Sequence, residues 1–321
     1  MQIEPFEKLV QQATEELYRK HPWLRRKMIR IKDETVVEYS DAQYYQYILP
    51  RYLFEGVEDT EKLEEWFLAE TNSGSQKFKR VLELACGNGR GTRIVAKYAN
   101  ELDAVDLSPS MISSAQTVKN LTNVRFYRGD MFEFTNKLAR ENRLHEYDLI
   151  FSFWGIFYGT NDEFITVDQH GNLLALDPQS ATQKAERNLR TLFDNLTQGT
   201  QFLFFHVRSD TEEQLIYRPI IGAYCSAFMP PRPTPSEIIL KKVLDSSGVD
   251  YQWRNVGGFV EYPSLEKALE VNLNFHLKGF FNDRLELPII YLIISNGLHR
   301  HIQEQKVKMS AGYIHIEGVK R

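Results

Sequence analysis

Cysteine is scarce in this chain, and long apolar runs are absent. The 321 residues include only two cysteines, Cys86 and Cys225, which cannot form a disulfide framework or the ligand set of a zinc site. The longest apolar run, Leu287 to Ser295, is too short to cross a bilayer. The charged N-terminus has no apolar stretch of the kind that a signal peptide needs. We therefore expect a cytoplasmic protein with no membrane partner.

The chain also lacks an excess of basic residues. Its formal net charge is -4, which provides no basic field to hold a phosphate backbone, so we expect no nucleic-acid partner. The hydrophobic fraction of 42% and the charged fraction of 26% are typical of folded globular proteins. The length and composition therefore favour one large or two modest folded domains.

The first seventy-five residues differ in pattern from the rest. Apolar residues recur at helical spacing from Pro5 to Arg30, and a second, aromatic-rich helical stretch runs from Ala42 to Leu68. The polar segment Thr71 to Ser75 then reads as a flexible joint. We expect residues 1–75 to form an N-terminal helical cap on a domain of residues 76–321.

From residue 76 onward, short apolar runs alternate with amphipathic segments, which is typical of β-α units and a parallel sheet. The expected strands are residues 81–84, 102–107, 124–127, 147–153, 201–207, 251–262 and 312–317. The expected helices are residues 92–100, 110–120, 181–196, 236–247, 264–280 and 287–305. The last two helices form an insertion, residues 264–305, before the final strand.

The clearest motif is the glycine-rich segment Val81 to Thr92, which lies between the first strand and the first helix of this domain. Glycines there let the backbone approach a ligand closely, and the helix N-terminus offers free N–H donors. The same pattern occurs in dinucleotide-binding turns and in plain tight turns. The segment alone therefore does not identify a ligand.

Three acidic residues in and after this segment indicate which ligand it binds. Glu83 precedes the glycines on the strand, where a carboxylate can hold an ammonium group. Asp106 ends the second strand, about 20 residues further on, where a carboxylate can bind both ribose hydroxyls. Asp130 follows the third strand and can accept a hydrogen bond from an adenine amino group, while Met131 packs on the ring. Asp106 or Asp130 alone could equally be a helix cap or turn residue, but together the three acids match the amine, ribose and adenine of one ligand.

The glycine-rich segment and the acids that follow it occur in the same order as in the class I S-adenosylmethionine-dependent methyltransferases, and the chain resembles this family over about Lys77 to Val207. Ala85 stands where many members have their first glycine. Tyr147 to Trp154 resembles the fourth-strand motif, and Asn195 to Thr200 resembles the turn before the fifth strand without its usual proline and second glycine. The resemblance implies a Rossmann-like α/β fold, with a mostly parallel seven-stranded sheet and helices on both faces. It implies S-adenosyl-L-methionine as cofactor and no metal, with these cofactor-binding residues: Glu83, Ala85, Gly87, Gly89, Asp106, Leu107, Met111, Asp130, Met131 and Phe153.

Aromatic residues are the expected lining of the acceptor site. Trp154, Phe157 and Tyr158 follow the fourth strand, in a loop from Gly155 to Phe164, at the sheet edge where ligands bind. The N-terminal cap and the insertion would close over this edge. The cap tyrosines considered for such a lid are Tyr39, Tyr44, Tyr45 and Tyr47, although aromatic residues at helical spacing are more often core.

Two polar residues at the end of the fifth strand are candidates for the chemistry. His206 could act as a general base, and Arg208 could hold an anionic substrate by paired hydrogen bonds. His206 could equally be a buried, satisfied histidine, and Arg208 a solvated charge. His170 and His276 are further histidines whose placement the sequence leaves open.

The sulfonium of the implied cofactor already makes its methyl group electrophilic, so the protein chiefly has to align a nucleophile and exclude water. We therefore expect methyl transfer to an oxygen, of a hydroxyl or a carboxylate, or to a nitrogen of a small metabolite or peptide. The chain has no Asn-Pro-Pro-Tyr-like tetrad after the fourth strand and no Pro-Cys pair, which disfavours DNA bases. A protein or RNA methyltransferase and a non-catalytic nucleoside-binding regulator remain alternatives. The sequence does not indicate the oligomeric state.

Overall fold

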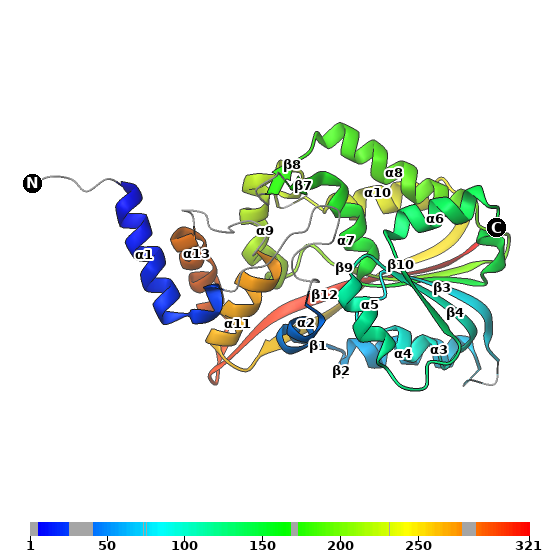
Figure 1. Cartoon of the computed structure of the whole chain (residues 1–321), viewed down its shortest axis with the longest axis horizontal. Helices are drawn as coiled ribbons and strands as arrows, with labels where there is room; N and C mark the ends of the chain where they lie inside the picture. Colours follow the sequence, from blue (N-terminus) through cyan, green and yellow to red (C-terminus); the bar gives the residue numbers. More distant parts are fainter. Residues whose placement is uncertain are drawn as a thin grey trace, which may run out of the picture.

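The computed structural model describes residues 6–25, 41–72, 74, 76–167, 173–230, 232–277 and 287–321, and its centre is one long twisted sheet (Figure 1). The core strands are β3 (Phe78–Leu84), β4 (Ala99–Asp106), β5 (Val124–Arg128), β6 (Leu149–Phe153), β9 (Gln201–Val207), β10 (Val249–Tyr262) and β12 (Lys306–Lys320). They lie in the order β5-β4-β3-β6-β9-β12-β10. The first five pair in parallel, and β12 runs antiparallel to both β9 and β10. The predicted α/β fold with a mostly parallel sheet is confirmed.

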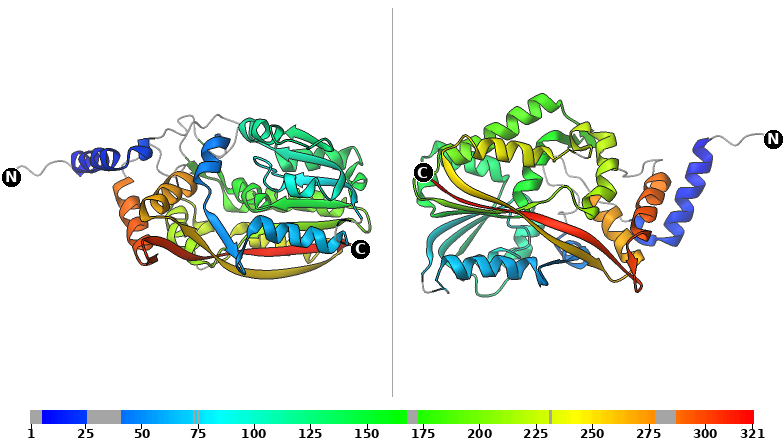
Figure 2. Two further views of the ribbon diagram at one scale, coloured as in Figure 1. Left: turned by 90° about the horizontal axis from the view of Figure 1, so that it is seen from below. Right: turned by 180° about the vertical axis from the view of Figure 1, so that it is seen from behind.

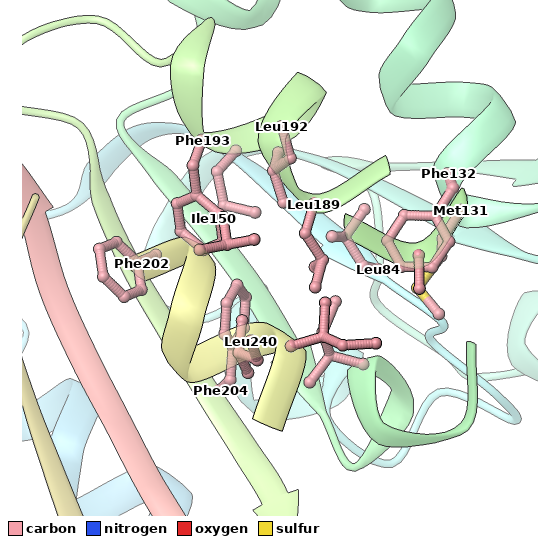
Figure 3. Close-up of a cluster of buried hydrophobic side chains, with 14 of the residues drawn as sticks. Leu84, Met131, Phe132, Ile150, Leu189, Leu192, Phe193, Phe202, Phe204 and Leu240 are labelled. Atoms are coloured by element: carbon pink, nitrogen blue, oxygen red, sulfur yellow. The ribbon is translucent and has the colours of Figure 1, made fainter. Parts of the chain in front are cut away.

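Helices cover both faces of this sheet (Figure 1). One face carries α6 (Met131–Arg140), α7 (Gly155–Asn161), α8 (Pro178–Asp194) and α10 (Pro235–Leu244). The other carries α3 (Asp59–Glu70) and α4 (Thr92–Val95). Side chains along β9 point alternately to the two faces of the sheet. Phe202 and Phe204 pack with α8 and α10, whereas Leu203 and Phe205 pack on the opposite face. Figure 3 shows the first of these clusters, in which the ring of Phe193 lies 5.1 Å from that of Phe202.

Short polar residues set the starts of the helices that follow the strands. Ser108 caps α5 (Pro109–Gln116), where its hydroxyl accepts a hydrogen bond from the Met111 N–H. Thr234 and Glu237 form a reciprocal capping box at the start of α10. Such caps satisfy backbone N–H groups that have no partner within the helix. The chain therefore turns at defined positions near the carboxyl ends of the strands.

The predicted helix from Ala42 to Leu68 is wrong, because this stretch contains two short strands. It divides into α2 (Ala42–Ile48), β1 (Arg51–Phe54), β2 (Val57–Glu58) and α3. Glu55 and Gly56, both with positive φ angles, form the tight turn between the two strands. β1 pairs antiparallel with β10, so the N-terminal segment extends the main sheet.

Other boundaries also differ from the prediction. The helix expected over residues 92–100 ends at Val95, because β4 begins at Ala99. The loop expected from Gly155 to Phe164 contains α7 and a 3-10 turn. The final strand is much longer than expected, and β11 (Ile302–Gln303) pairs with it. The helix α6 and the hairpin of β7 (Ile165–Val167) with β8 (Leu173–Ala175) were not predicted.

The insertion before the last strand lies at one end of the molecule (Figure 2). It contains α11 (Leu265–Val271), a π-helical turn (Asn272–His276) and α13 (Leu287–His299). These elements share a core with α9 (Glu212–Tyr224) and lie near α1 (Phe6–Lys20). Among the described residues, no helix is both long and apolar enough to span a membrane.

Candidate active site

A cavity lies at the carboxyl ends of the parallel strands, where ligands bind in open α/β sheets. The glycine loop and the residues that follow β4, β5 and β6 form one side of it. The N-terminal segment, α9 and the π-helical turn form the other side. The sequence-predicted residues in this lining are Ala85, Gly87, Asp106, Leu107, Asp130, Met131, Phe153, Trp154 and Tyr158.

Asp106 is fixed by the backbone of the glycine loop. Its two carboxylate oxygens accept hydrogen bonds from the N–H groups of Gly87 (2.8 Å) and Ser108 (2.9 Å). Burial raises the pKa of the Asp106 carboxyl, and these two hydrogen bonds oppose that effect. Each oxygen keeps a second lone pair, so the carboxylate can still accept hydrogen bonds from a pair of ribose hydroxyls.

Asp130 is both a helix cap and a cavity residue. Its Oδ1 accepts hydrogen bonds from the N–H groups of Phe132 and Glu133 at the start of α6. These bonds leave Oδ2 oriented by the cap and able to accept from an exocyclic amine. Beside it, Met131 lines the cavity and packs against Gly159, where an added Cβ would lie 1.8 Å from the Met131 Cε.

Glu83, Gly89 and Met111 lie behind the cavity lining. Glu83 is 1% exposed beneath the loop, and within the described part of the chain its Oε2 atom has no hydrogen-bond partner. Burial raises the pKa of this carboxyl to about 8. A buried carboxyl group whose oxygen lacks a partner fits a site that receives a cationic group nearby. The ammonium of S-adenosylmethionine would be such a group. Gly89 turns the loop with a φ of 85°, and Met111 is fully buried below it.

Ala85 shows why a non-glycine residue is tolerated at the start of the loop. It adopts a left-handed conformation with a φ of 57°, which is unfavourable for alanine. Its methyl group occupies the space beside Gly155, where an added Cβ would lie 2.3 Å from the Ala85 Cβ. The two small residues therefore share one space between β3 and α7.

This packing predicts a compensating pair of substitutions. We expect Gly155→Ala to destabilise the protein by about 1–3 kcal/mol through overpacking. Ala85→Gly should restore much of this loss in the double variant, because it removes the clashing methyl group and the strained φ angle. Urea unfolding of both single variants and the double variant measures the coupling, and additive effects would contradict the shared space.

A buried ion pair joins the N-terminal segment to the glycine loop. Asp59 is 2% exposed and accepts hydrogen bonds from Arg90 Nη2 (2.6 Å) and Trp154 Nε1 (3.0 Å). Trp154 itself has a φ of 68°, a strained conformation for a bulky residue and one that marks functional sites. Arg90 lies 5.6 Å from the centre of the Phe153 ring. All four side chains line the cavity, so this ion pair shapes the site as well as the fold.

A second polar group lies on the side of the cavity formed by the N-terminal segment, α9 and the π-helical turn, and the sequence did not predict it. Glu213, in the first turn of α9, accepts a hydrogen bond of 2.6 Å from the Tyr52 hydroxyl, and burial raises its pKa to about 7. His276 Nε2 lies 4.0 Å from the Glu213 Oε1 atom, and burial lowers the pKa of this imidazole to about 3. The signal available in the sequence was an acid just past the fifth strand, at the sheet edge where ligands bind.

His206 lies on the opposite side of β9 from the cavity. Its Nδ1 is 2.8 Å from the Val207 oxygen and its Nε2 is 2.7 Å from the Ser236 hydroxyl. It is fully buried, and burial lowers its pKa to about 4. Because side chains alternate along a strand, Val207 faces the cavity and His206 does not. The position of His206 therefore gives no support to a role as general base.

Two other residues predicted to bind the acceptor, Phe157 and Arg208, are not part of the cavity lining. Phe157 packs edge-on against His206, with ring centres 5.2 Å apart. Arg208 pairs with Asp210 through two hydrogen bonds and does not line the cavity. Of the cap tyrosines, Tyr45 lines the cavity, Tyr44 is buried and donates to Glu270, and Tyr47 is 64% exposed. Tyr39 and His170 lie outside the described residues.

Comparison with known protein families matches the part of the chain that contains the glycine loop. A family model described as a methyltransferase domain matches residues 81–188, which include the glycine loop, Asp106, Asp130 and Trp154. Glu213 and His276 lie outside this match. No curated protein matches the chain.

Three solved structures have a similar fold. The YcgJ protein from Bacillus subtilis has a TM-score of 0.46 at 16% identity, over 80% of this chain and 98% of that one. A functionally unknown protein from Deinococcus radiodurans has a TM-score of 0.48 at 12% identity, over 87% and 97%. A SAM-dependent methyltransferase from Agrobacterium tumefaciens has a TM-score of 0.43 at 12% identity, over 83% and 64%.

Proposed function

We propose that the chain, in which a methyltransferase-domain model matches residues 81–188, is a class I S-adenosylmethionine-dependent methyltransferase that methylates a hydroxyl or amino group of a small molecule. The observation that carries this proposal is the acceptor side of the cavity. There, aromatic side chains surround Glu213 and His276 next to the residues assigned to the cofactor. A group that can take up a proton is useful to an acceptor that must lose one.

The cofactor, when bound, supplies an electrophilic methyl group on a sulfonium. Asp106 and Asp130 would orient its ribose and adenine, and the glycine loop would lie against its amino-acid part. Tyr45, Tyr52 and Trp154 would hold the acceptor and exclude water from the reaction. The protein therefore contributes mainly alignment and an environment of low polarity.

The enclosure of the acceptor side favours a small molecule over a macromolecule. Tyr52 from β1 and His276 from the insertion both contribute to the lining, so segments far apart in the sequence surround the acceptor. A carboxylate acceptor is disfavoured, because Arg90 is paired with the buried Asp59. A protein or RNA acceptor and a non-catalytic regulator remain the alternatives to test. The buried, unpaired Cys86 and Cys225 support a cytoplasmic location within this proposal.

Calorimetry and isotope transfer test the proposed function directly. We expect S-adenosylmethionine and S-adenosylhomocysteine to bind, and NAD to show no binding. Incubation with cofactor that carries a deuterated methyl group, together with a cell extract, should label small molecules detected by mass spectrometry. Label recovered only in protein or RNA would contradict the small-molecule proposal, and binding without any label would favour a regulator.

A further inference from the structure

Glu213 is a buried acid that faces the cavity with few partners. It is 3% exposed and lines the cavity together with Tyr52, its hydrogen-bond donor. His276 Nε2 is also buried and has no hydrogen-bond partner among the residues that the structure describes. The 4.0 Å between His276 Nε2 and Glu213 Oε1 is too long for a direct hydrogen bond. However, a single donor nitrogen could lie about 2.8 Å from each of these two atoms.

The charges around the cavity favour a cationic guest. The described lining contains the acids Asp59, Asp106, Asp130, Asp162 and Glu213, and Arg90 is the only lysine or arginine in it. Arg90 is bound to Asp59 and does not neutralise Glu213. Aromatic rings lie on the same side, with Tyr52 and Trp154 5.9 Å apart and Tyr45 and Phe275 5.6 Å apart. Aromatic faces attract cations, so the acceptor side combines acid and aromatic surface.

We propose that the acceptor is an amine that enters as an ammonium ion, and that Glu213 binds it beside His276 and takes up its proton. This inference rests on the proposed function and names its substrate class. Neutral His276 offers Nε2 as a second hydrogen-bond acceptor for the same nitrogen. The aromatic residues would contact the body of the amine.

The step balances in atoms and charge. An ammonium N–H bond breaks, its electrons remain on nitrogen, and the proton goes to the Glu213 carboxylate. The nitrogen lone pair then forms a bond to the methyl carbon, while the carbon–sulfur bond breaks and its electrons go to sulfur. The products are a methylated ammonium ion, neutral S-adenosylhomocysteine and protonated Glu213. The proton leaves the protein when the product is released.

Burial brings the free energy of this proton transfer from an ammonium ion to Glu213 close to zero. An apolar environment raises the pKa of a carboxyl group and lowers that of an ammonium, so the two values approach each other. Burial already raises the pKa of Glu213 to about 7. An aliphatic hydroxyl is a far weaker acid than an ammonium, so the same carboxylate would deprotonate it much less readily. The site is therefore better matched to an amine.

The groups that face Glu213 are tyrosines and one histidine. Tyr52 on β1, Tyr217 one turn further along α9 and Tyr262 at the end of β10 interact with it electrostatically, and all three have raised pKa values. His276 stacks on Tyr217 with ring centres 4.5 Å apart. All four groups are neutral at pH 6–8, so within this cluster Glu213 is the group that titrates there. Binding of an ammonium ion below pH 7 should thus release the proton of Glu213.

Calorimetry with benzylamine tests whether an amine binds at Glu213 with release of a proton. The experiment uses the full-length protein saturated with S-adenosylhomocysteine. Titrations at pH 6 in buffers of different ionisation enthalpy count the protons that are released. We expect the wild type to release nearly one proton per benzylamine, and Glu213→Gln to release none and to bind at least about tenfold more weakly. Glu212→Gln removes a neighbouring acid whose side chain is 51% exposed, and it should match the wild type.

Tyr52→Phe tests the same carboxyl without removing it. The Tyr52 hydroxyl lowers the pKa of Glu213, so its loss should extend proton release to higher pH. An unshifted release profile in this variant would overturn the proposal. Benzylamine binding without proton release, no detectable benzylamine binding, or tighter binding of benzyl alcohol or benzoate would also overturn it. Failure of S-adenosylhomocysteine to bind the wild type would instead contradict the proposed function.

Discussion

Replacing Asp106 with alanine should weaken S-adenosylmethionine binding by roughly 5- to 150-fold. The change removes a charged acceptor worth about 1–3 kcal/mol, and about 1.4 kcal/mol corresponds to a factor of ten in affinity. Asp106 also holds the Gly87 and Ser108 N–H groups, so its loss loosens the glycine loop. Isothermal titration calorimetry with both S-adenosylmethionine and S-adenosylhomocysteine measures the effect.

A matched control lies on the same strand. Asp103 is 1% exposed and binds Arg80, Arg125 and Tyr147, well away from the cavity lining. Asp103→Asn should lower the stability and leave the cofactor affinity unchanged in the folded fraction. Wild-type affinity in Asp106→Ala would remove this residue from the cofactor site.

Most of the residues predicted to bind the cofactor line the cavity, and their position could be predicted from the sequence because its signals are local. Asp106 and Asp130 each follow an apolar strand, and the glycine loop joins one strand directly to one helix. The strand Gln201–Val207 was predicted with its observed boundaries. Neighbouring side chains on a strand point to opposite faces, so a difference of one position decides which residue faces the cavity. In this structure Val207 faces it and His206 does not.

The residues proposed to bind the acceptor could not be predicted from the sequence, because distant segments bring them together. Tyr52, Glu213 and His276 come from β1, α9 and the π-helical turn, and none belongs to a recognisable motif. The placement of Tyr52 depends on the pairing of β1 with β10, which lies about 200 residues later in the chain and is a long-range contact. Propensity favoured a helix for this segment, and sheet pairing overrode it.

The pairing of β1 with β10 also ties residues 1–75, which we expected to form a cap, to the main sheet. Phe54, Leu63 and Phe67 from this segment are fully buried in one cluster with Val81 and Phe151 of the central strands. The segment thus contributes to the core of the sheet as well as to the cavity. Its most deeply buried charge, Asp59, connects these two roles.

Asp59→Ala should therefore destabilise the folded protein by about 1–3 kcal/mol. The change leaves the guanidinium of Arg90, whose side chain is 20% exposed, without its ion-pair partner. It also removes the acceptor of the Trp154 indole N–H, which holds that ring over the cavity. Urea unfolding followed by tryptophan fluorescence gives the free energy of unfolding.

An exposed ion pair next to Asp59 supplies the control. Glu58 and Arg51 have side chains that are 41% and 60% exposed, so Glu58→Ala should change the stability by at most about 1 kcal/mol. Replacing both members of the buried pair, in Asp59→Leu with Arg90→Met, should restore much of the stability because no unpaired charge remains. That double variant should still bind acceptor poorly, since Trp154 has lost its anchor. A loss below about 1 kcal/mol in Asp59→Ala alone would show that Arg90 finds water or another partner, and that the ion pair does not hold the N-terminal segment on the glycine loop.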